Sequence, residues 1–245
     1  MPTLFVVIPV FNEPQTLNEC VKRVLGVVLK KSWTIHVVLV DDGSDAVTRL
    51  AAEQLTEKFP TSLTLLRHTD NRGKGAALQT GFSHVVVESK DDLDAMIIQD
   101  ADLEYDPNDF VQLIDALESC GPNCAVFGNR WHGGSVETGM KAWLHMRANR
   151  LLTISSNLAT GLRISDMECC YKIIPLPILK RILPALTENR FGIEPQIAAA
   201  LARARAYVAE VPVSYVPRTF KAGKKIGPID GLRAFWVILQ SKFHF

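Results

Sequence analysis

The feature that most constrains the fold is an alternation of short apolar runs with longer segments of helical spacing. Five runs are apolar without alternating polar positions, as strands buried on both faces of a parallel sheet are. They are Leu4–Val10, Ile35–Asp41, Leu63–Arg67, Ala95–Asp100 and Cys124–Gly128. The intervening segments with helical spacing are Gln15–Leu29, Asp45–Lys58, Gly75–Glu88 and Pro107–Ser119. This alternation predicts an α/β fold with a doubly wound, mostly parallel sheet.

The second half of the chain has a looser pattern. It predicts a helix at Lys141–Leu158, a short strand at Cys170–Ile174 and a helix at Glu194–Arg203. No repeat or linker divides the 245 residues, a length that suits one substantial core. We therefore expect a single domain over residues 1–245, with a sheet-forming half at 1–128 and a more helical half at 129–245.

Charge and cysteine content restrict the partners and the compartment. The 27 Lys and Arg nearly balance the 26 Asp and Glu, so the charge gives no reason to expect nucleic acid as a partner. The five cysteines are scattered and lack the paired spacing of a zinc site. We interpret them as free thiols in a reducing cytoplasm.

The chain has no obvious targeting or membrane-spanning segment. Its first residues enter a strand-like run without the basic and apolar regions of a secretory signal. No run approaches the roughly 20 apolar residues that span a bilayer. We expect a cytoplasmic protein that can contact a membrane only at its surface, without spanning it.

Polar residues gather where three of the expected strands end. Pro9, Asn12 and Glu13 follow the first strand, Asp41 and Asp42 end the second, and Asp100 and Asp102 end the fourth. Carboxyl ends of parallel strands share one edge of the sheet, where such folds bind ligands. The sequence therefore predicts one cleft at this edge.

Asp100, Asp102 and Glu104 are spaced so that they could hold one hard cation. Carboxylates leaving a buried strand together suit Mg²⁺ or Mn²⁺. The alternative is a solvated acidic loop with a helix cap at Asp106 or Asn108.

Two glycine-containing segments also point to this cleft. Asp41 and Asp42 could accept hydrogen bonds from a base or ribose while Gly43 turns the chain, although a capping turn explains the same residues. In the segment 71–75, glycines flank Lys74 ahead of a helix. Its backbone amides and ammonium could close on a diphosphate, or the segment could be a flexible helix entry.

Taken together, these motifs resemble the family 2 glycosyltransferases. The matching segments are Ile8–Glu13, Val40–Ser44, Asn71–Gly75 and Gln99–Glu104. The second half resembles the dolichyl-phosphate mannose synthase branch of polyprenyl-phosphate glycosyltransferases. The segments that carry this likeness are Gly128–Arg130, Arg147–Asn149, Arg190–Glu194, Glu210–Val213, Pro217–Thr219, Gly223–Gly227 and Asp230–Gly231.

The resemblance implies a glycosyltransferase-A type fold with a nucleotide-sugar-binding half and an acceptor-binding half. Pro9, Glu13 and Asp42 would hold the nucleoside, and Asp100, Asp102 and Glu104 the metal on the donor diphosphate. We place further nucleotide-sugar contacts at Phe11, Asn12, Asp41, Gly43, Lys74 and Ala101. The family usually has Gln or a similar group at Glu104 and often tyrosine at Phe11, so both positions depart from its pattern.

The implied acceptor is a polyprenyl phosphate. A phosphate monoester is already largely ionised near neutral pH, so cations that neutralise and aim it suffice, whereas a hydroxyl needs a base. The expected phosphate contacts are Arg130, Arg147, Arg218 and Lys224, and the expected catalytic residues are Asp102, Arg130 and Arg218. The resemblance thus implies inverting, metal-dependent hexose transfer, with mannose from GDP-mannose favoured over glucose from UDP-glucose.

Two alternatives stay open. A soluble hydroxyl acceptor would need a base, for which Asp166, Glu168 and Glu194 are available, although we interpret Asp166 as architectural. Anchoring at the membrane could use a partner subunit or the surface itself. Basic and aromatic residues in Arg218–Lys242 suit peripheral contact with the cytoplasmic face of a membrane.

Overall fold

A computed structural model describes residues 1–30, 33–132, 140–218 and 228–243. In these residues one sheet has seven strands in the order β3-β2-β1-β4-β6-β5-β7. Strand β6 runs antiparallel to both its neighbours, and the other pairs are parallel. The strands are β1 (Thr3–Val10), β2 (Thr34–Asp42), β3 (Leu63–His68), β4 (Ala95–Ile98), β5 (Cys124–Asn129), β6 (Lys172–Pro175) and β7 (Tyr207–Pro212).

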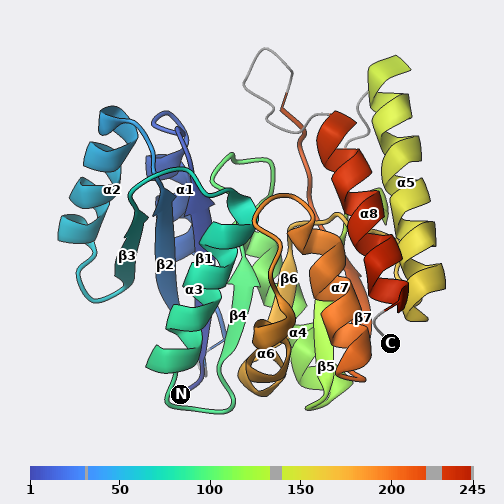
Figure 1. Ribbon diagram of the computed structural model, residues 1–245. Coiled ribbons are helices and arrows are strands. Elements are labelled where there is room, and N and C mark those ends of the chain that lie inside the picture. The colour runs from blue at the N-terminus through green and yellow to red at the C-terminus, as the bar shows by residue number, and fades with distance from the viewer. Residues whose placement is uncertain (31–32, 133–139, 219–227, 244–245) are drawn as a thin grey trace.

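Helices cover both faces of this sheet, as Figure 1 shows. One face carries α3 (Lys74–Glu88), α6 (Leu176–Ile182) and α7 (Ile193–Arg203). The other carries α1 (Leu17–Leu25), α2 (Ala46–Lys58) and α4 (Phe110–Cys120). The long helices α5 (Met140–Thr160) and α8 (Pro228–Phe243) pack against each other and against α7. They form a helical wall beside the last strands.

The core follows from the apolar runs of the sequence. Val6, Val7 and Ile8 in β1 are completely buried, because helices cover both sides of this central strand. Helix α1 places Leu17, Val21 and Val24 on one buried stripe at helical spacing. Burial of this stripe holds α1 on the sheet, while the parallel direction of β1, β2, β3 and β4 brings their carboxyl ends together.

The predicted α/β fold is confirmed, with several differences in detail. Helix α1 begins at Leu17 and ends at Leu25, shorter than the predicted 15–29. Two elements were not predicted, namely α6 and the edge strand β7. Strand β7 is short and ends in Pro212, so its apolar pattern is weak.

The strand order reverses between β1 and β4. Chain connections leave β1 toward β2 on one side and reach β4 on the other, which opens a crevice at the carboxyl ends of these two strands. The residues that follow β1 and β4 therefore face a common space. No helix among the described residues has the length and apolarity needed to cross a membrane.

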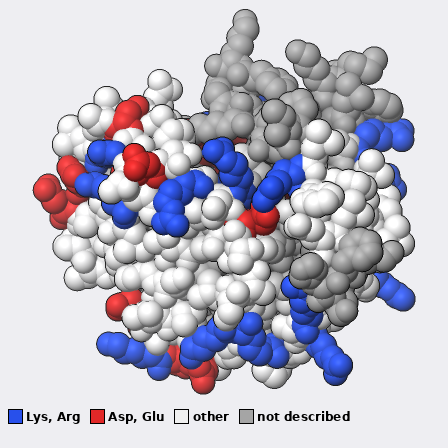
Figure 2. Space-filling model, viewed as in Figure 1, with Lys and Arg blue, Asp and Glu red and all other residues white. Residues whose placement is uncertain are grey.

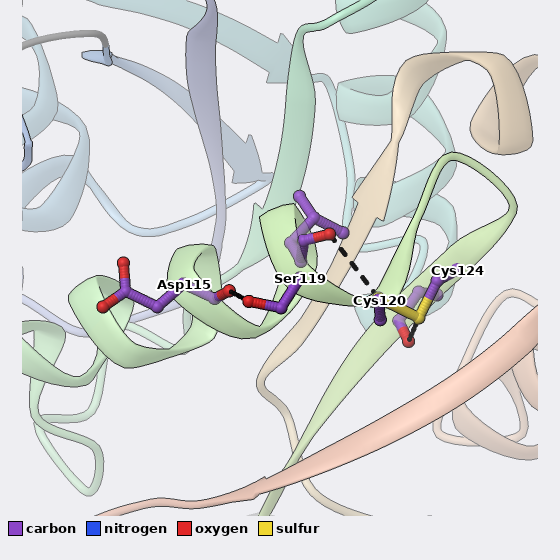
Figure 3. Close-up of a disulfide and its surroundings, with 6 residues drawn as sticks. Asp115, Ser119, Cys120 and Cys124 are labelled. Atoms are coloured by element: carbon purple, nitrogen blue, oxygen red, sulfur yellow. Dashed lines mark hydrogen bonds between the residues drawn. A yellow bond between two sulfur atoms is a disulfide. The ribbon is translucent and has the colours of Figure 1, made fainter.

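The cysteines differ from the sequence-based interpretation. Cys120 at the end of α4 and Cys124 at the start of β5 form a disulfide, with their Cα atoms 5.9 Å apart (Figure 3). Cys20, Cys169 and Cys170 are free and buried. The expectation of five free thiols is therefore wrong. Its spacing argument considered metal pairs and did not consider a bridge across one tight turn.

This bridge predicts a measurable thiol count. Alkylation of the denatured, unreduced protein should modify three cysteines, and prior reduction should raise the number to five, as mass spectrometry would show. In denaturant unfolding, Cys120→Ser should lower the free energy of unfolding by about 2 kcal/mol, because the bridge restricts the unfolded chain. Cys20→Ser is the matched control for the thiol count. Five alkylated residues without reduction would contradict the bridge.

Candidate active site

A cavity of about 970 Å³ lies at the carboxyl ends of β1, β2 and β4. Its sheet side is lined by Pro9, Phe11, Glu13, Asp42, Lys74, Asp100, Ala101, Asp102 and Glu104. Its helical side is lined by Arg130, Asn149, Leu151, Leu152, Glu168, Phe191, Glu194, Leu232 and Phe235. In Figure 2 several basic side chains gather on the upper part of the visible face. The cavity combines charged groups, which lie on its sheet side and at Arg130, Glu168 and Glu194, with apolar side chains at Leu151, Leu152, Phe191, Leu232 and Phe235.

Asp42 binds the segment that leads into α3. Its carboxylate accepts hydrogen bonds from the backbone N–H groups of Arg72 (2.9 Å) and Gly73 (2.7 Å). His68 contacts the same carboxylate at 2.7 Å. Two of the backbone amides that could have bound a diphosphate are thus bound to Asp42, and a diphosphate contact of this segment stays a prediction. Of the two cations in this segment, Lys74 lines the cavity and Arg72 does not.

Three predicted nucleotide contacts instead support the framework behind the cavity. Asp41 is fully buried, accepts from the Ser44 backbone N–H (2.9 Å) and lies 3.3 Å from Arg67. The Asn12 side chain accepts from the backbone of Asp45 at 2.8 Å. Gly43 has φ of +71°, the conformation that favours glycine. Asn12, Asp41 and Gly43 are not among the lining residues, so their direct contact with a nucleotide stays a prediction.

A line of alternating charges forms the floor of the cavity. Lys74 lies 2.8 Å from Asp100 and 3.1 Å from Glu194. Glu194 also pairs with the completely buried Lys172, whose ammonium donates to the backbone carbonyl of Cys169. Burial alone lowers the pKa of Lys74, but Asp100 and Glu194 more than offset it and hold that pKa well above its usual value. Lys74 therefore stays charged.

Arg218 bridges two carboxylates that come from different strands. Its guanidinium donates to Glu13 at 3.1 and 3.2 Å and to Asp102 at 3.2 Å. Burial, then Asp100 and Glu104, raise the pKa of Asp102 to about 7, while Arg218 works in the opposite direction. Negative charge is thus crowded at this point, and Arg218 is the cation that partly offsets it.

Glu104 anchors the chain that carries Arg218. One of its oxygens accepts from the Tyr215 hydroxyl and the other from the Arg218 backbone N–H, each at 2.8 Å. Both oxygens of the third predicted metal ligand are therefore engaged. Its role as a ligand stays a prediction that would require one of these contacts to break.

The fit of a divalent cation rests on Asp100 and Asp102. Within the described ranges, no three Asp, Glu, His or Cys side chains are arranged to hold a metal ion together, because Asp100 faces Lys74 and Asp102 faces Arg218. Nevertheless, the two carboxylates crowd negative charge at the cavity, and oxygen ligands of this kind suit Mg²⁺ or Mn²⁺. The pair fits such a cation if Arg218 releases Asp102.

Arg130 is held by Asp166. Two of its nitrogens donate to the two carboxylate oxygens at 2.7 Å each, and its backbone N–H donates at 3.1 Å. Asp166 is completely buried, whereas Arg130 lines the cavity. The contacts are those expected of an architectural Asp166. They leave the Arg130 Nη1 group without a role in this pair.

The other two predicted phosphate contacts lie elsewhere. Arg147 is exposed on α5 and is not among the residues that line the cavity. Lys224 lies outside the described residues. The structure therefore brings together Arg130 and Arg218 at the cavity, and the roles of Arg147 and Lys224 stay predictions.

Glu168 differs from the other carboxylates of the cavity. Its Oε1 is buried without a hydrogen-bond partner, and no ion pair engages the side chain among the described residues. Burial raises the pKa of Glu168 to about 7, and the carboxylate of Glu194 adds to the rise. The nearby cations Lys172 and Arg130 are already bound to Glu194 and Asp166.

The sequence analysis missed the groups that only folding brings here. Phe191, Leu232 and Phe235 form part of the apolar wall, and Tyr215 reaches Glu104 from a segment 111 positions away. One sequence feature could have drawn attention to Lys172, namely a lysine that opens an apolar strand. A lysine at such a position requires a buried counter-charge.

The arrangement can be compared with known proteins. The family described as Glycosyl transferase family 2 matches residues 5–183, which is most of the chain. The protein belongs to this glycosyltransferase family. The match includes the ends of β1, β2 and β4, where the acidic side of the cavity lies.

Several curated relatives of this family 2 member are named as polyprenyl-phosphate sugar transferases. An undecaprenyl-phosphate 4-deoxy-4-formamido-L-arabinose transferase from Edwardsiella ictaluri is 27% identical over 213 residues, or 87% of this chain. The chain spans only 60% of that protein's length. A polyprenol monophosphomannose synthase from Mycolicibacterium smegmatis is 25% identical over 91% of this chain and 80% of its own. A dolichyl-phosphate beta-glucosyltransferase from Trichomonas vaginalis is 27% identical over 86% and 65%.

Solved structures confirm the glycosyltransferase-A type fold. A glucosyl-3-phosphoglycerate synthase from Mycobacterium tuberculosis, in complex with Mn²⁺, UDP and glucosyl-3-phosphoglycerate, gives a TM-score of 0.65 at 15% identity. The alignment covers 99% of this chain and 80% of that one. The same synthase in complex with Mg²⁺ and UDP also gives 0.65, at 14% identity, with the same coverage. At this identity the likeness concerns the fold alone.

Asp166→Asn should destabilise the protein. It removes the counter-charge of a guanidinium that is largely shielded from water, which we expect to lower the free energy of unfolding by about 3 kcal/mol in a denaturant titration. The control is Asp92→Asn, whose exposed pair with Lys180 should contribute less than about 1 kcal/mol. A fully stable Asp166→Asn protein without turnover would instead point to a catalytic base and a hydroxyl acceptor.

Proposed function

We propose that this protein transfers a hexose, with mannose favoured, from a nucleotide-sugar to the phosphate of a polyprenyl phosphate. The observation that carries the proposal is a cavity that has charged groups on its sheet side and apolar side chains from α5, α8 and Phe191 on its helical side. The two substrates contain the same kinds of groups, because the donor carries a charged diphosphate and the acceptor carries an apolar prenyl chain. The relatives named as polyprenyl-phosphate sugar transferases support it.

The sheet side suits the nucleotide diphosphate. Lys74 stays protonated between Asp100 and Glu194 and lies at the N-terminus of α3, a place that favours anions. Pro9 and Asp42 line the same side and would lie along the nucleoside. We keep GDP-mannose as the favoured donor and UDP-glucose as the alternative.

Asp100 and Asp102 would hold Mg²⁺ or Mn²⁺, which supplies positive charge to offset the negative charge that develops on the departing diphosphate. Arg218 bridges Glu13 and Asp102 in this structure. Once Asp102 takes a different partner, the Arg218 guanidinium becomes available to an anion. Arg218 can thus hold the site together before substrates bind and orient a phosphate afterwards.

The acceptor side needs positive charge and no base. Arg130 lines the cavity and is fixed by Asp166, so it can hold a phosphate without reorganising. A phosphate oxygen is already ionised near neutral pH. Direct attack on the anomeric carbon would invert its configuration.

The decisive test is an assay of glycolipid formation. The protein, Mn²⁺ and a short polyprenyl phosphate in detergent are incubated with GDP-mannose or UDP-glucose in parallel. We expect an acid-labile glycolipid from one donor, and at least about a hundredfold lower kcat for Asp102→Asn, because charge stabilisation on the leaving group is lost. Chelation of the metal should have a similar effect.

Asp92→Asn makes the same change on the surface and should leave the rate unaltered. Consumption of the donor with a sugar or glycerate hydroxyl, and no glycolipid, would contradict a phosphate acceptor. A base would then be required, and Glu168 has a carboxylate in the cavity that could serve. Glu168 is thus a candidate base for the alternative of a soluble hydroxyl acceptor, besides Asp166.

A membrane-facing surface is consistent with this acceptor. Helices α5 and α8 expose Leu151, Ile154, Leu158, Leu232, Phe235, Trp236 and Leu239. Leu151, Leu232 and Phe235 also line the cavity, so the exposed apolar surface continues into the site. We propose that this surface meets the cytoplasmic side of a lipid membrane, by itself or beside a membrane-anchored partner subunit.

Vesicle binding tests the membrane contact. In Leu232→Gln/Trp236→Gln, sedimentation with vesicles that contain polyprenyl phosphate should fall at least about tenfold, because two exposed apolar side chains no longer enter the lipid. Leu93→Gln is a matched control, since Leu93 is 70% exposed and lies just before β4, at the amino end of that strand and away from the cavity. Equal losses in both proteins would place the contact elsewhere.

A further inference from the structure

Glu168 lies in the chain between α5 and β6, on the wall of the cavity. Its charged neighbours belong to both ends of the cavity. Glu194, which pairs with Lys74 at the diphosphate end, and Arg130, at the acceptor end, are both close enough to affect the pKa of Glu168. In a transfer between these two ends, the sugar must lie between them. Glu168 therefore lines the region of the cavity in which the sugar would lie.

The side chain does not contribute to holding the fold together. Its buried Oε1 has no hydrogen-bond partner, and the carboxylates of Glu194 and Asp166 already use the nearest cations. A buried oxygen without a partner costs stability, as does a carboxylate next to another carboxylate. Such a residue points to a ligand that supplies the missing hydrogen-bond donor.

The carboxylate of Glu168 can bind only some of the chemical groups that the two substrates contain. A phosphate or diphosphate would be repelled by the carboxylate, and a prenyl chain would leave its oxygen without a donor. The nucleoside belongs at the other end, near Pro9 and Asp42. Sugar hydroxyls remain, because they donate hydrogen bonds and bring no negative charge.

On the basis of the proposed function, we propose that Glu168 accepts hydrogen bonds from hydroxyl groups of the sugar that is transferred. It is then a specificity-determining residue that distinguishes the loaded donor from the free nucleoside diphosphate. The ligand class is a hexose with free hydroxyls, carried on a nucleoside diphosphate.

Calorimetric titration with Mn²⁺ tests this assignment. Wild-type protein, Glu168→Gln and Glu168→Ala are titrated with GDP-mannose and UDP-glucose, and with GDP and UDP. For the preferred donor we expect Glu168→Gln to weaken binding about tenfold or more, since hydrogen bonds to a charged group are lost, while binding of the free diphosphate changes less than about twofold. Glu57→Gln makes the same change on the exposed side of α2 and should alter neither.

Deoxygenated donors sharpen the result. Among nucleotide-sugars that each lack one hydroxyl, the analogue without the contacted group should bind wild type and Glu168→Gln equally. Analogues that retain the group should still distinguish the two proteins. This pattern requires contact with the sugar and does not follow from a general loss of structure.

Unfolding measurements control for misfolding. The native pKa of Glu168 lies above the ordinary value of 4.5, so its charge destabilises the fold progressively between that pH and about 7. Glu168→Gln should therefore raise Tm at pH 8 and change it much less near pH 4.5. A more stable protein with weaker donor binding supports the assignment.

Other outcomes overturn it. If Glu168→Gln weakens donor and free diphosphate equally, or neither, the residue does not contact the sugar. Unchanged donor affinity with a kcat at least a hundredfold lower for a hydroxyl acceptor makes Glu168 a general base instead. If wild-type protein binds none of the nucleotide-sugars, the proposed function itself fails. If wild-type protein binds them and the Glu168 variants bind them equally well, only the assignment of Glu168 fails.

Discussion

The site depends on how carboxylates are kept charged away from water. Asp100, Lys74, Glu194 and Lys172 form a row of alternating charges, so each buried charge in it has an opposite neighbour. A buried charge without such a neighbour would be strongly destabilising. Because Lys74 starts α3, Asp100 follows β4 and Glu194 lies in α7, this chain of pairs also fixes three elements around the cavity. The fold and the charge distribution therefore support each other.

Arg218 and Arg130 show two ways of placing a guanidinium at such a site. Arg130 is fixed from behind by a completely buried Asp166 and has a constant position. Arg218 is held by Glu13 and Asp102, which belong to the donor side of the cavity and have other proposed roles. The first arrangement suits permanent positioning, and the second suits an exchange of partners when substrates bind. Glu104 anchors the Arg218 backbone, so such an exchange would involve the side chain of Arg218 alone.

Much of the fold followed from the sequence, and parts of the site did as well. Apolar runs such as 4–10 and 95–100 predicted strands because a strand covered on both faces needs them, although β4 ends at Ile98. The ends of β1 and β4 were expected to meet, and Glu13 and Asp102 do meet through Arg218. In contrast, β7 and α6 have weak local patterns, and a disulfide between Cys120 and Cys124 did not follow from spacing alone.

The sequence by itself determined the alternating architecture, the family, and the edge of the sheet at which acidic residues gather. These properties depend on local periodicity and on short motifs, which are visible along the chain. Only the tertiary structure decided which partner each charged side chain has. Asp42 binds backbone amides, Glu104 binds Tyr215 and Arg218, and Glu168 has no partner in the described chain. Hydrogen bonds and ion pairs depend on distances of about 3 Å between residues that can be a hundred positions apart, and spacing along the chain does not encode such distances.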